Sequence, residues 1–200
     1  MRLGIMGGTF DPPHLAHLVI AEMARASLQL DRVVFIPAGD PWMKSAQTVT
    51  PAGKRAEMVG LAIDSNSSFS LSSIEVDRPG PSYTVDTVEQ LAAEMGHNSD
   101  IYLLLGWDSM AELTSWKAPY RLSKMVRFVA FPRPGAGRPD AAALEKALPG
   151  SSERIIYMDE PYLSISSTCI RQRVKEGKSV RYLVPDAVGQ YIIEHKLYTA

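Results

Sequence analysis

Two histidines near the N-terminus are the first residues whose types and spacing could perform chemistry. His14 and His17 lie three positions apart, so they share one face of a helix. Both imidazoles could donate hydrogen bonds to phosphate oxygens near the start of that helix. A His-x-x-His pair is more often a surface pair, or occasionally two metal ligands, so the pair alone leaves its role open.

Two glycines precede the histidines and follow a short apolar run directly. Gly7 and Gly8 would let a ligand approach the backbone closely. Asp11 followed by Pro12 fits the N-cap and the first position of a helix, whose free N–H groups then face the end of the preceding strand. The segment up to His17 therefore predicts an anion site.

A second cluster of phosphate-binding residue types lies about 150 positions further along the chain. Three consecutive hydroxyl residues, Ser166, Ser167 and Thr168, stand at a predicted helix start, where they could cap the helix and donate to phosphate. Arg171 follows about one turn inside that helix, and a guanidinium can bind phosphate through two parallel hydrogen bonds. A cap without a ligand is the commoner role of such a cluster, and these residues alone leave that alternative open.

Alternating strand and helix patterns predict the elements that position these groups. Apolar runs typical of buried strands occur at residues 2–6, 32–36, 69–76, 101–105, 127–131 and 154–158. Apolar residues at helical spacing lie between most of them, which indicates an α/β fold with a mainly parallel, twisted sheet and helices on both faces. Ligands of such folds bind beyond the carboxyl ends of the strands.

Composition limits the kind of protein this chain can be. Its 200 residues, 46% of them hydrophobic, can bury one sizeable core, so we expect a single domain. Acidic and basic residues number 22 and 21, so no strong positive field exists for nucleic acid. Cys169 is the only cysteine, and no apolar run approaches a membrane span of about 20 residues. We expect a cytoplasmic protein without a nucleic-acid or membrane partner; a homo-oligomer is left open.

The glycine order excludes two common phosphate-binding loops, because it is neither Gly-x-Gly-x-x-Gly nor a Walker A sequence. Residues 7–17 instead resemble the nucleotidyltransferase superfamily, whose hallmark is a His-x-Gly-His motif after a Gly-Thr-Phe-Asp-Pro start. Ala16 replaces the usual glycine, a small-for-small exchange. Residues 165–171 resemble the family's Ile-Ser-Ser-Thr-x-Ile-Arg signature at every fixed position. The resemblance extends over residues 7–198 and implies a Rossmann-like fold whose C-terminal helical part, about 165–200, carries this signature.

Segments between the two motifs resemble the nicotinate-nucleotide adenylyltransferases within that superfamily. Residues 75–87 are similar to their Glu…Arg…Pro-Ser-Tyr-Thr-x-Asp-Thr segment, although such a loop is otherwise a plain strand-to-helix connection. Asp108 follows an apolar strand, where a carboxylate could bind ribose hydroxyls. Trp116 could stack on a flat pyridine ring; the alternative is that it packs in the core. Lys44 and Arg133 match basic positions of the family, with solvent exposure as the alternative; Trp42-Met43 departs from the family's Pro-His before that lysine.

The resemblance implies transfer of the adenylyl group of ATP, bound with Mg²⁺, to nicotinate mononucleotide, without a metal site made by the protein itself. The implied ATP-binding residues are Gly7, Gly8, Thr9, Phe10, His14, His17, Ile165, Ser166, Ser167, Thr168 and Arg171. The implied nicotinate-nucleotide-binding residues are Lys44, Ser82, Tyr83, Thr84, Gly106, Asp108, Trp116 and Arg133. The implied catalytic residues are His14, His17, Lys44 and Arg171. Alternatives are a nicotinamide-mononucleotide or phosphopantetheine adenylyltransferase, or a nucleotide sensor without catalysis.

Overall fold

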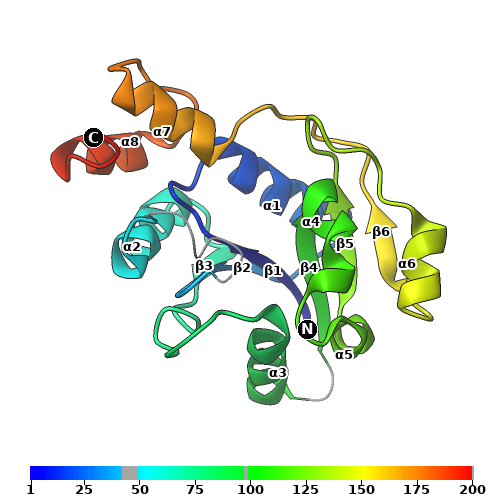
Figure 1. Ribbon diagram of the computed structural model, residues 1–200. Helices are drawn as coiled ribbons and strands as arrows, with labels where there is room; N and C mark the ends of the chain where they lie inside the picture. The colour runs from blue at the N-terminus through cyan, green and yellow to red at the C-terminus, as the bar shows by residue number, and fades with distance from the viewer. Residues whose placement is uncertain (42–48, 97–98, 200) are drawn as a thin grey trace.

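A six-stranded, entirely parallel sheet organises the chain (Figure 1). The computed structural model describes residues 1–41, 49–96 and 99–199. The strands are β1 (Arg2–Gly8), β2 (Arg32–Pro37), β3 (Phe69–Leu71), β4 (Asp100–Gly106), β5 (Arg127–Phe131) and β6 (Ile155–Tyr157), and their order across the sheet is β3-β2-β1-β4-β5-β6. The predicted α/β class with a parallel sheet is confirmed.

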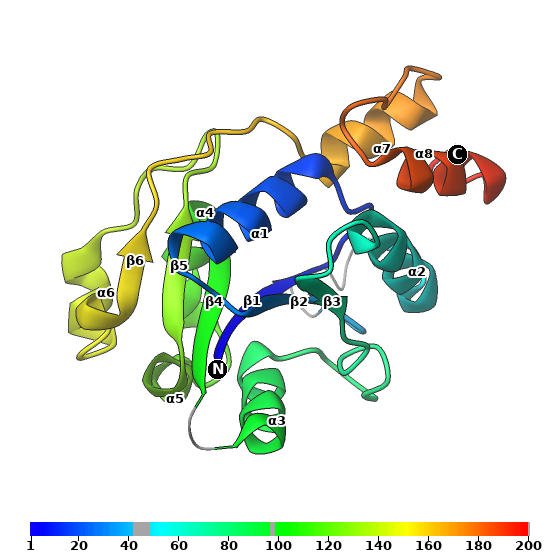
Figure 2. The same cartoon turned by 180° about the vertical axis from the view of Figure 1, so that it is seen from behind.

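Helices cover both faces of this sheet (Figure 2). On one face lie α1 (Leu15–Ser27) and α2 (Ala52–Ile63), and the apolar cluster on this side also includes residues of α7 (Ser167–Lys175) and α8 (Asp186–Glu194), which lie beyond the start of α1 and beside α2. The other packs against α3 (Thr84–Met95), α4 (Trp107–Ala111), α5 (Pro119–Met125) and α6 (Ala141–Ala147). Short 3₁₀ turns lie at Leu113–Ser115 and Ser152–Arg154. Within the described ranges, no helix is both long and apolar enough to cross a membrane.

The sequence of β4 shows why the sheet is buried on both faces. Side chains alternate between the faces of a strand, so a strand covered on both faces must be apolar throughout. Ile101 and Leu103 join the cluster on the α3 side, whereas Tyr102 and Leu104 join the cluster on the α1 side. All four are at most 4% exposed, so β4 is a central strand, and α4 begins directly after it at Trp107.

The chain direction across the sheet changes between β1 and β4. From β1 the chain proceeds to β2 and β3 on one side, and then returns to β4, β5 and β6 on the other. Connections that leave the carboxyl ends of β1 and β4 therefore run to opposite sides, and such a switch point is the usual ligand site of these sheets. The predicted residues Gly7, Gly8, Gly106 and Asp108 all lie at these two strand ends.

Two details of the predicted elements were wrong. The strand predicted at 69–76 ends at Leu71, because a turn follows in which Asp77 N–H donates to Ser73 O (2.8 Å) and Ser73 Oγ–H donates to Asp77 (2.5 Å). The helix predicted to start at Pro12 starts at Leu15, since a residue that precedes a proline, as Pro12 does, is disfavoured in helical conformation.

Candidate active site

The start of α1 brings the two predicted histidines together. His14 is the N-cap of α1 and His17 is its third residue, so both lie at the helix N-terminus rather than one turn inside it. Their rings stack with centroids 3.6 Å apart and planes 17° apart. The edge of the Phe10 ring packs against His17, with centroids 4.9 Å apart. This packing fixes both imidazoles beside the end of β1.

A backbone contact determines which nitrogen of His17 can donate. The N–H of His14 donates to Nδ1 of His17 at 3.1 Å, so Nδ1 is an acceptor. In a neutral imidazole one nitrogen accepts and the other carries the proton. Nε2 of His17 is therefore the donor of the neutral ring, at the end of the helix where anions are favoured.

His14 is held in its neutral form by its surroundings. Burial, together with the smaller effect of the Arg133 charge, lowers its pKa from 6.5 to about 4. Its Nδ1 is buried, and the described residues offer it no hydrogen-bond partner. At neutral pH His14 thus acts through hydrogen bonding and not through a positive charge.

The neutral state of His14 predicts a loss of stability in mild acid. Between pH 6.5 and pH 4 the unfolded chain binds a proton at this position that the folded chain rejects, so the free energy of unfolding falls as the pH falls. The expected loss is on the order of 3 kcal/mol over that window. Urea unfolding of wild type and His14→Gln at several pH values measures it. The difference in free energy of unfolding, wild type minus His14→Gln, should decrease as the pH decreases; a difference that stays constant would contradict the burial of a neutral His14.

The glycines at the end of β1 are explained better by a ligand than by the protein's own packing. A Cβ placed on Gly7 would meet no protein atom within 4 Å, and one on Gly8 would touch only the Phe10 ring at ordinary distance. Gly7 is also exposed to solvent. Phe10 as a whole residue is 2% exposed and belongs to the core, whereas Thr9 is partly exposed.

Gly7→Ala should therefore weaken ATP binding without destabilising the fold. An added methyl group that meets no protein atom leaves the melting temperature unchanged, whereas overlap with a ligand costs about 1–3 kcal/mol, or roughly tenfold or more in affinity. Calorimetric titration with ATP and a thermal scan measure the two effects. Gly137→Ala is the matched control, because Gly137 is also exposed with open space at its Cβ position. Equal ATP affinity in both variants would remove Gly7 from the site.

The second motif meets the first although about 155 residues separate them. Ser166 is the N-cap of α7, and its Oγ accepts from Cys169 N–H at 3.2 Å, as predicted for a cap. Ser167 Oγ–H donates to Pro12 O at 2.8 Å, and Arg171 Nη1 donates to Asp11 O at 2.8 Å. The N-termini of α1 and α7 are thus joined at residues 11–12.

Arg171 and its neighbours are partly engaged by the protein itself. A second guanidinium nitrogen of Arg171, Nη2, donates to Thr168 Oγ1 at 3.3 Å. Ile165 is partly buried against the core on the α1 side. The hydroxyls of this cluster therefore build the junction between the motifs, and any phosphate contact would use the remaining N–H groups of the α7 start and of Arg171.

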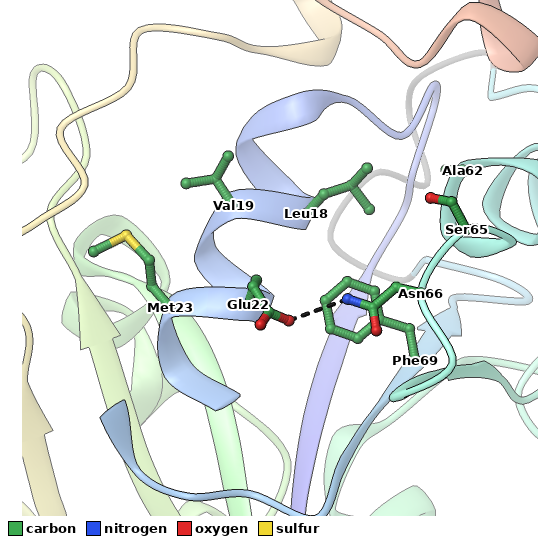
Figure 3. A pocket seen from close by; sticks show the side chains of 8 residues that line it. All are labelled: Leu18, Val19, Glu22, Met23, Ala62, Ser65, Asn66 and Phe69. Carbon is green, nitrogen blue, oxygen red and sulfur yellow. Dashed lines mark hydrogen bonds between the residues drawn. The ribbon is translucent and has the colours of Figure 1, made fainter. Parts of the chain in front are cut away.

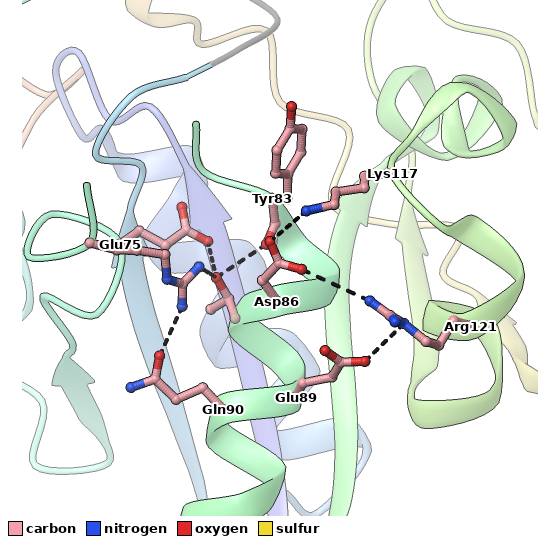
Figure 4. A network of polar contacts seen from close by, with 9 residues as sticks. Glu75, Tyr83, Asp86, Glu89, Gln90, Lys117 and Arg121 are labelled. Atoms are coloured by element: carbon pink, nitrogen blue, oxygen red, sulfur yellow. Dashed lines mark hydrogen bonds and ion pairs between the residues drawn. The ribbon is translucent and has the colours of Figure 1, made fainter. Parts of the chain in front are cut away.

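The N-terminus of α3 lies in a network of charged residues (Figure 4). Tyr83 is the N-cap, and Lys117 Nζ lies 4.3 Å from the centre of its ring. Lys117 also pairs with Asp86 at 3.0 Å, and Arg121 pairs with Glu89 at 2.8 Å and with Asp86 at 3.9 Å. The acid in the first turn of α3 is therefore compensated by two cations, which leaves the N–H groups of Thr84 and its neighbours attractive to an anion.

Ser82 attaches this segment to the loop after β2, and the buried Glu75 is bonded to α3. Ser82 Oγ accepts from Gly39 N–H at 2.9 Å and from Asp40 N–H at 3.3 Å. Burial raises the pKa of Glu75, whose carboxylate accepts from Thr87 Oγ1 at 2.7 Å. The hydroxyl of Ser82 thus serves the fold, and a substrate contact by Ser82 would use other atoms.

The acid predicted after β4 pairs with the arginine predicted after β5. Arg133 Nε lies 3.2 Å from Asp108 Oδ2. Oδ1 of Asp108 is buried and, within the described ranges, has no hydrogen-bond partner. A Cβ on Gly106 would overlap this carboxylate, so Gly106 allows the acid to lie against the backbone. Asp108 thus holds a buried acceptor without a partner in the described residues, just beyond the carboxyl end of β4.

Trp116 packs partly against the core on the α3 side, next to the Lys117 that contacts Tyr83. Its indole Nε1 is buried and lacks a partner in the described part of the chain. Trp116 is therefore close to the N-terminus of α3, where the resemblance places the pyridine ring. Lys44, the remaining predicted site residue, lies outside the described residues.

A cavity of about 320 Å³ lies away from these residues, between α1 and the connection from α2 to β3 (Figure 3). Leu18, Val19 and Phe69 line it, and Glu22 at its edge accepts from Asn66 Nδ2 at 3.1 Å. None of its lining residues belongs to the predicted site.

Sequence reasoning missed two residues that hold the candidate site together, Arg55 and Tyr198, and it wrongly gave the side chain of Asp11 the role of a helix cap. Arg55 is 1% exposed and shares the buried face of α2 with Met58 and Val59. A charged residue on an apolar helix face is a signal that the pattern did contain. No comparable signal exists for Tyr198.

Comparison with known proteins places the chain in a class. A family model described as Cytidylyltransferase-like matches residues 5–173, and the chain belongs to this family.

The most similar relatives share a more specific name. A Roseiflexus protein is 47% identical over 196 residues, covering 98% of this chain and 97% of its own, and a Dehalococcoides mccartyi protein is 40% identical over 198 residues, covering 99% and 97%. Both carry the name "probable nicotinate-nucleotide adenylyltransferase". The solved structure of Plasmodium falciparum nicotinic acid mononucleotide adenylyltransferase complexed with NaAD has the same fold, with a TM-score of 0.81 at 20% identity over 98% of this chain and 97% of that one.

Proposed function

We propose that this protein transfers the adenylyl group of ATP to nicotinate mononucleotide, giving nicotinate adenine dinucleotide and pyrophosphate. The relatives named for this activity match over almost the whole chain, at 40% to 47% identity. The reaction would serve NAD biosynthesis. We place it in the cytoplasm, as expected for a chain whose only cysteine is free.

The junction between the two motifs carries this proposal. The hydrogen bonds from Ser167 to Pro12 and from Arg171 to Asp11 bring the N-termini of α1 and α7 together at the carboxyl end of β1. Two helix N-termini that meet at a strand end can hold a multiply charged anion through their backbone N–H groups. A triphosphate fits that arrangement. Mg²⁺ enters as part of the substrate MgATP.

The proposed reaction is a direct in-line displacement. The acceptor's phosphate monoester has a second pKa of about 6, so near neutral pH it is already a nucleophilic anion and no strong base is needed. One of its oxygens forms a bond to the α-phosphorus while the bond from that phosphorus to the pyrophosphate oxygen breaks. The protein then contributes positioning and hydrogen bonds to the developing charge.

The described residues suggest which groups position the substrates and donate hydrogen bonds to the developing charge. The Nε2–H of His17 and neutral His14 would donate to the transferring phosphate, and Arg171 would bind the leaving phosphates. On the acceptor side, the free oxygen of Asp108 suits ribose hydroxyls, and Trp116 suits the pyridine ring.

Product analysis tests this proposal. The purified chain is incubated with MgATP and nicotinate mononucleotide, and the products are identified by mass spectrometry with a parallel pyrophosphate assay. We expect the dinucleotide and pyrophosphate in a one-to-one ratio. Absence of the dinucleotide, or release of AMP without it, would refute the proposed reaction.

A further inference from the structure

A fully buried arginine joins three connections that surround the candidate ATP site. Arg55 donates from Nη1 to Thr9 O at 2.7 Å, from Nε to Thr50 O at 2.7 Å and from Nη2 to Gly39 O at 3.1 Å. Thr9 follows β1, Gly39 follows β2, and Thr50 precedes α2. Hydrogen bonds from a charged donor are about twice as strong as neutral ones, so these carbonyls are held firmly relative to one another.

Asp11 supplies the negative charge near this arginine. Burial lowers the pKa of Arg55, and the charge of Asp11 opposes that effect. The Oδ2 of Asp11 accepts from Thr50 N–H at 3.2 Å. Thr50 is thus bound through its carbonyl by Arg55 and through its N–H by Asp11.

The other oxygen of Asp11 is bound by the C-terminal end of the chain. Tyr198 Oη–H donates to Asp11 Oδ1 at 2.6 Å across 187 positions of sequence. Burial and the neighbouring carboxylate raise the pKa of Tyr198, so its hydroxyl stays protonated and remains a donor at neutral pH. The backbone carbonyl of the same aspartate accepts from Arg171, as described above.

Residues 9–12 are therefore held from two sides. Arg171 and Ser167 of α7 bind the carbonyls of Asp11 and Pro12, while Arg55 and Tyr198 bind Thr9 O and the Asp11 side chain. Displacement of this loop by about 1 Å would move the start of α1, and misplacement of that size can cost about 10²-fold in rate.

We propose that Tyr198 and Arg55 are positioning residues for adenylyl transfer, which act by fixing residues 9–12 at the ATP site through Asp11, Thr9 and Thr50. This inference rests on the proposed function. Tyr198 lies in the turn that follows α8, so this turn would help to complete the phosphate site although 187 positions separate Tyr198 from Asp11.

Tyr198→Phe tests the proposal, with Tyr191→Phe as a matched control. Tyr191 Oη–H also donates to a carboxylate at 2.6 Å, that of Glu57, but it joins α8 to α2 away from residues 9–12. Both variants lose one hydroxyl and one bond of the same kind, so similar decreases in melting temperature are expected. We expect Tyr198→Phe alone to lower kcat/KM for ATP by about tenfold or more and to speed hydrogen exchange in peptides that contain residues 9–12.

The outcomes separate this inference from the proposed function. If wild type forms the dinucleotide but Tyr198→Phe matches Tyr191→Phe in kcat/KM and in exchange, the positioning role is refuted and the proposed function stands. If wild type forms no dinucleotide, the proposed function fails, and exchange and ATP titration still report whether Tyr198 holds the loop.

Arg55→Lys tests the role of the arginine. Lysine keeps the positive charge but cannot bond to three carbonyls in the same geometry, so the ATP affinity of Arg55→Lys should be lower than that of Tyr198→Phe. Wild-type ATP affinity in a folded Arg55→Lys would overturn the role of Arg55.

Discussion

His17→Ala is expected to lower turnover by about 10² to 10³-fold, the usual cost of removing one donor to a transition state. Nδ1 of His17 accepts from His14 N–H, so its Nε2 carries the proton and is the donor at the start of α1. The loss should appear in kcat, because the charge on the transferring phosphate develops only as the bond to pyrophosphate breaks.

Two further substitutions separate this donor from the structural role of the same ring. Asparagine keeps an acceptor near the position of Nδ1 and lacks an atom at the position of Nε2, whereas glutamine reaches that position with an N–H group. His17→Asn should therefore lose as much turnover as His17→Ala, and His17→Gln should retain more. Steady-state kinetics and melting temperatures measure this, with the exposed His195→Ala as control. Near wild-type turnover in a folded His17→Asn would contradict the role of Nε2.

The fold could be predicted well because its signals are local. Apolar runs of strand length alternate with helical spacing, and the strands predicted at 2–6, 32–36, 101–105, 127–131 and 154–158 lie within two residues of the observed ends. The positions of the two glycines and of the Ser-Ser-Thr cap also follow from local chemistry. Burial on both faces makes such strands nearly continuous in apolar residues, which is a strong pattern.

Contacts between distant segments could not be predicted in the same way. The bond from Tyr198 to Asp11 depends on where the last turn of the chain lies, and no local pattern specifies that. The side chain of Asp11 was expected to cap α1, but it binds Thr50 and Tyr198 instead because α1 begins only at Leu15. The pairing of Arg133 with Asp108 is equally a product of β4 and β5 lying side by side.

The second large effect concerns the choice between two pyridine nucleotides. Nicotinate carries a carboxylate, which only accepts hydrogen bonds, whereas the amide of nicotinamide would place an NH₂ group against donors. The N–H groups at the start of α3 are donors, and Lys117 and Arg121 compensate the charge of Asp86 beside them. If the pyridine ring binds at the start of α3, as proposed, we expect an anionic substituent to be favoured there.

The expected preference for nicotinate mononucleotide is at least about 10²-fold in kcat/KM. A missing or opposed buried hydrogen bond costs about 1–3 kcal/mol, so two such bonds are enough for a preference of about 10²-fold. In the proposed site Trp116 would stack on either ring, so Trp116→Ala should weaken both nucleotides to a similar extent and leave the ratio unchanged. Lys117→Gln leaves Asp86 less compensated and should lower the ratio, with Lys146→Gln in α6 as control.

Paired assays of pyrophosphate release, with MgATP and either nicotinate or nicotinamide mononucleotide, test the account most directly. The account predicts that the wild-type protein turns over nicotinate mononucleotide with a kcat/KM at least about 10²-fold higher than that for nicotinamide mononucleotide. Comparable values for the two nucleotides, or a preference for the amide, would contradict it.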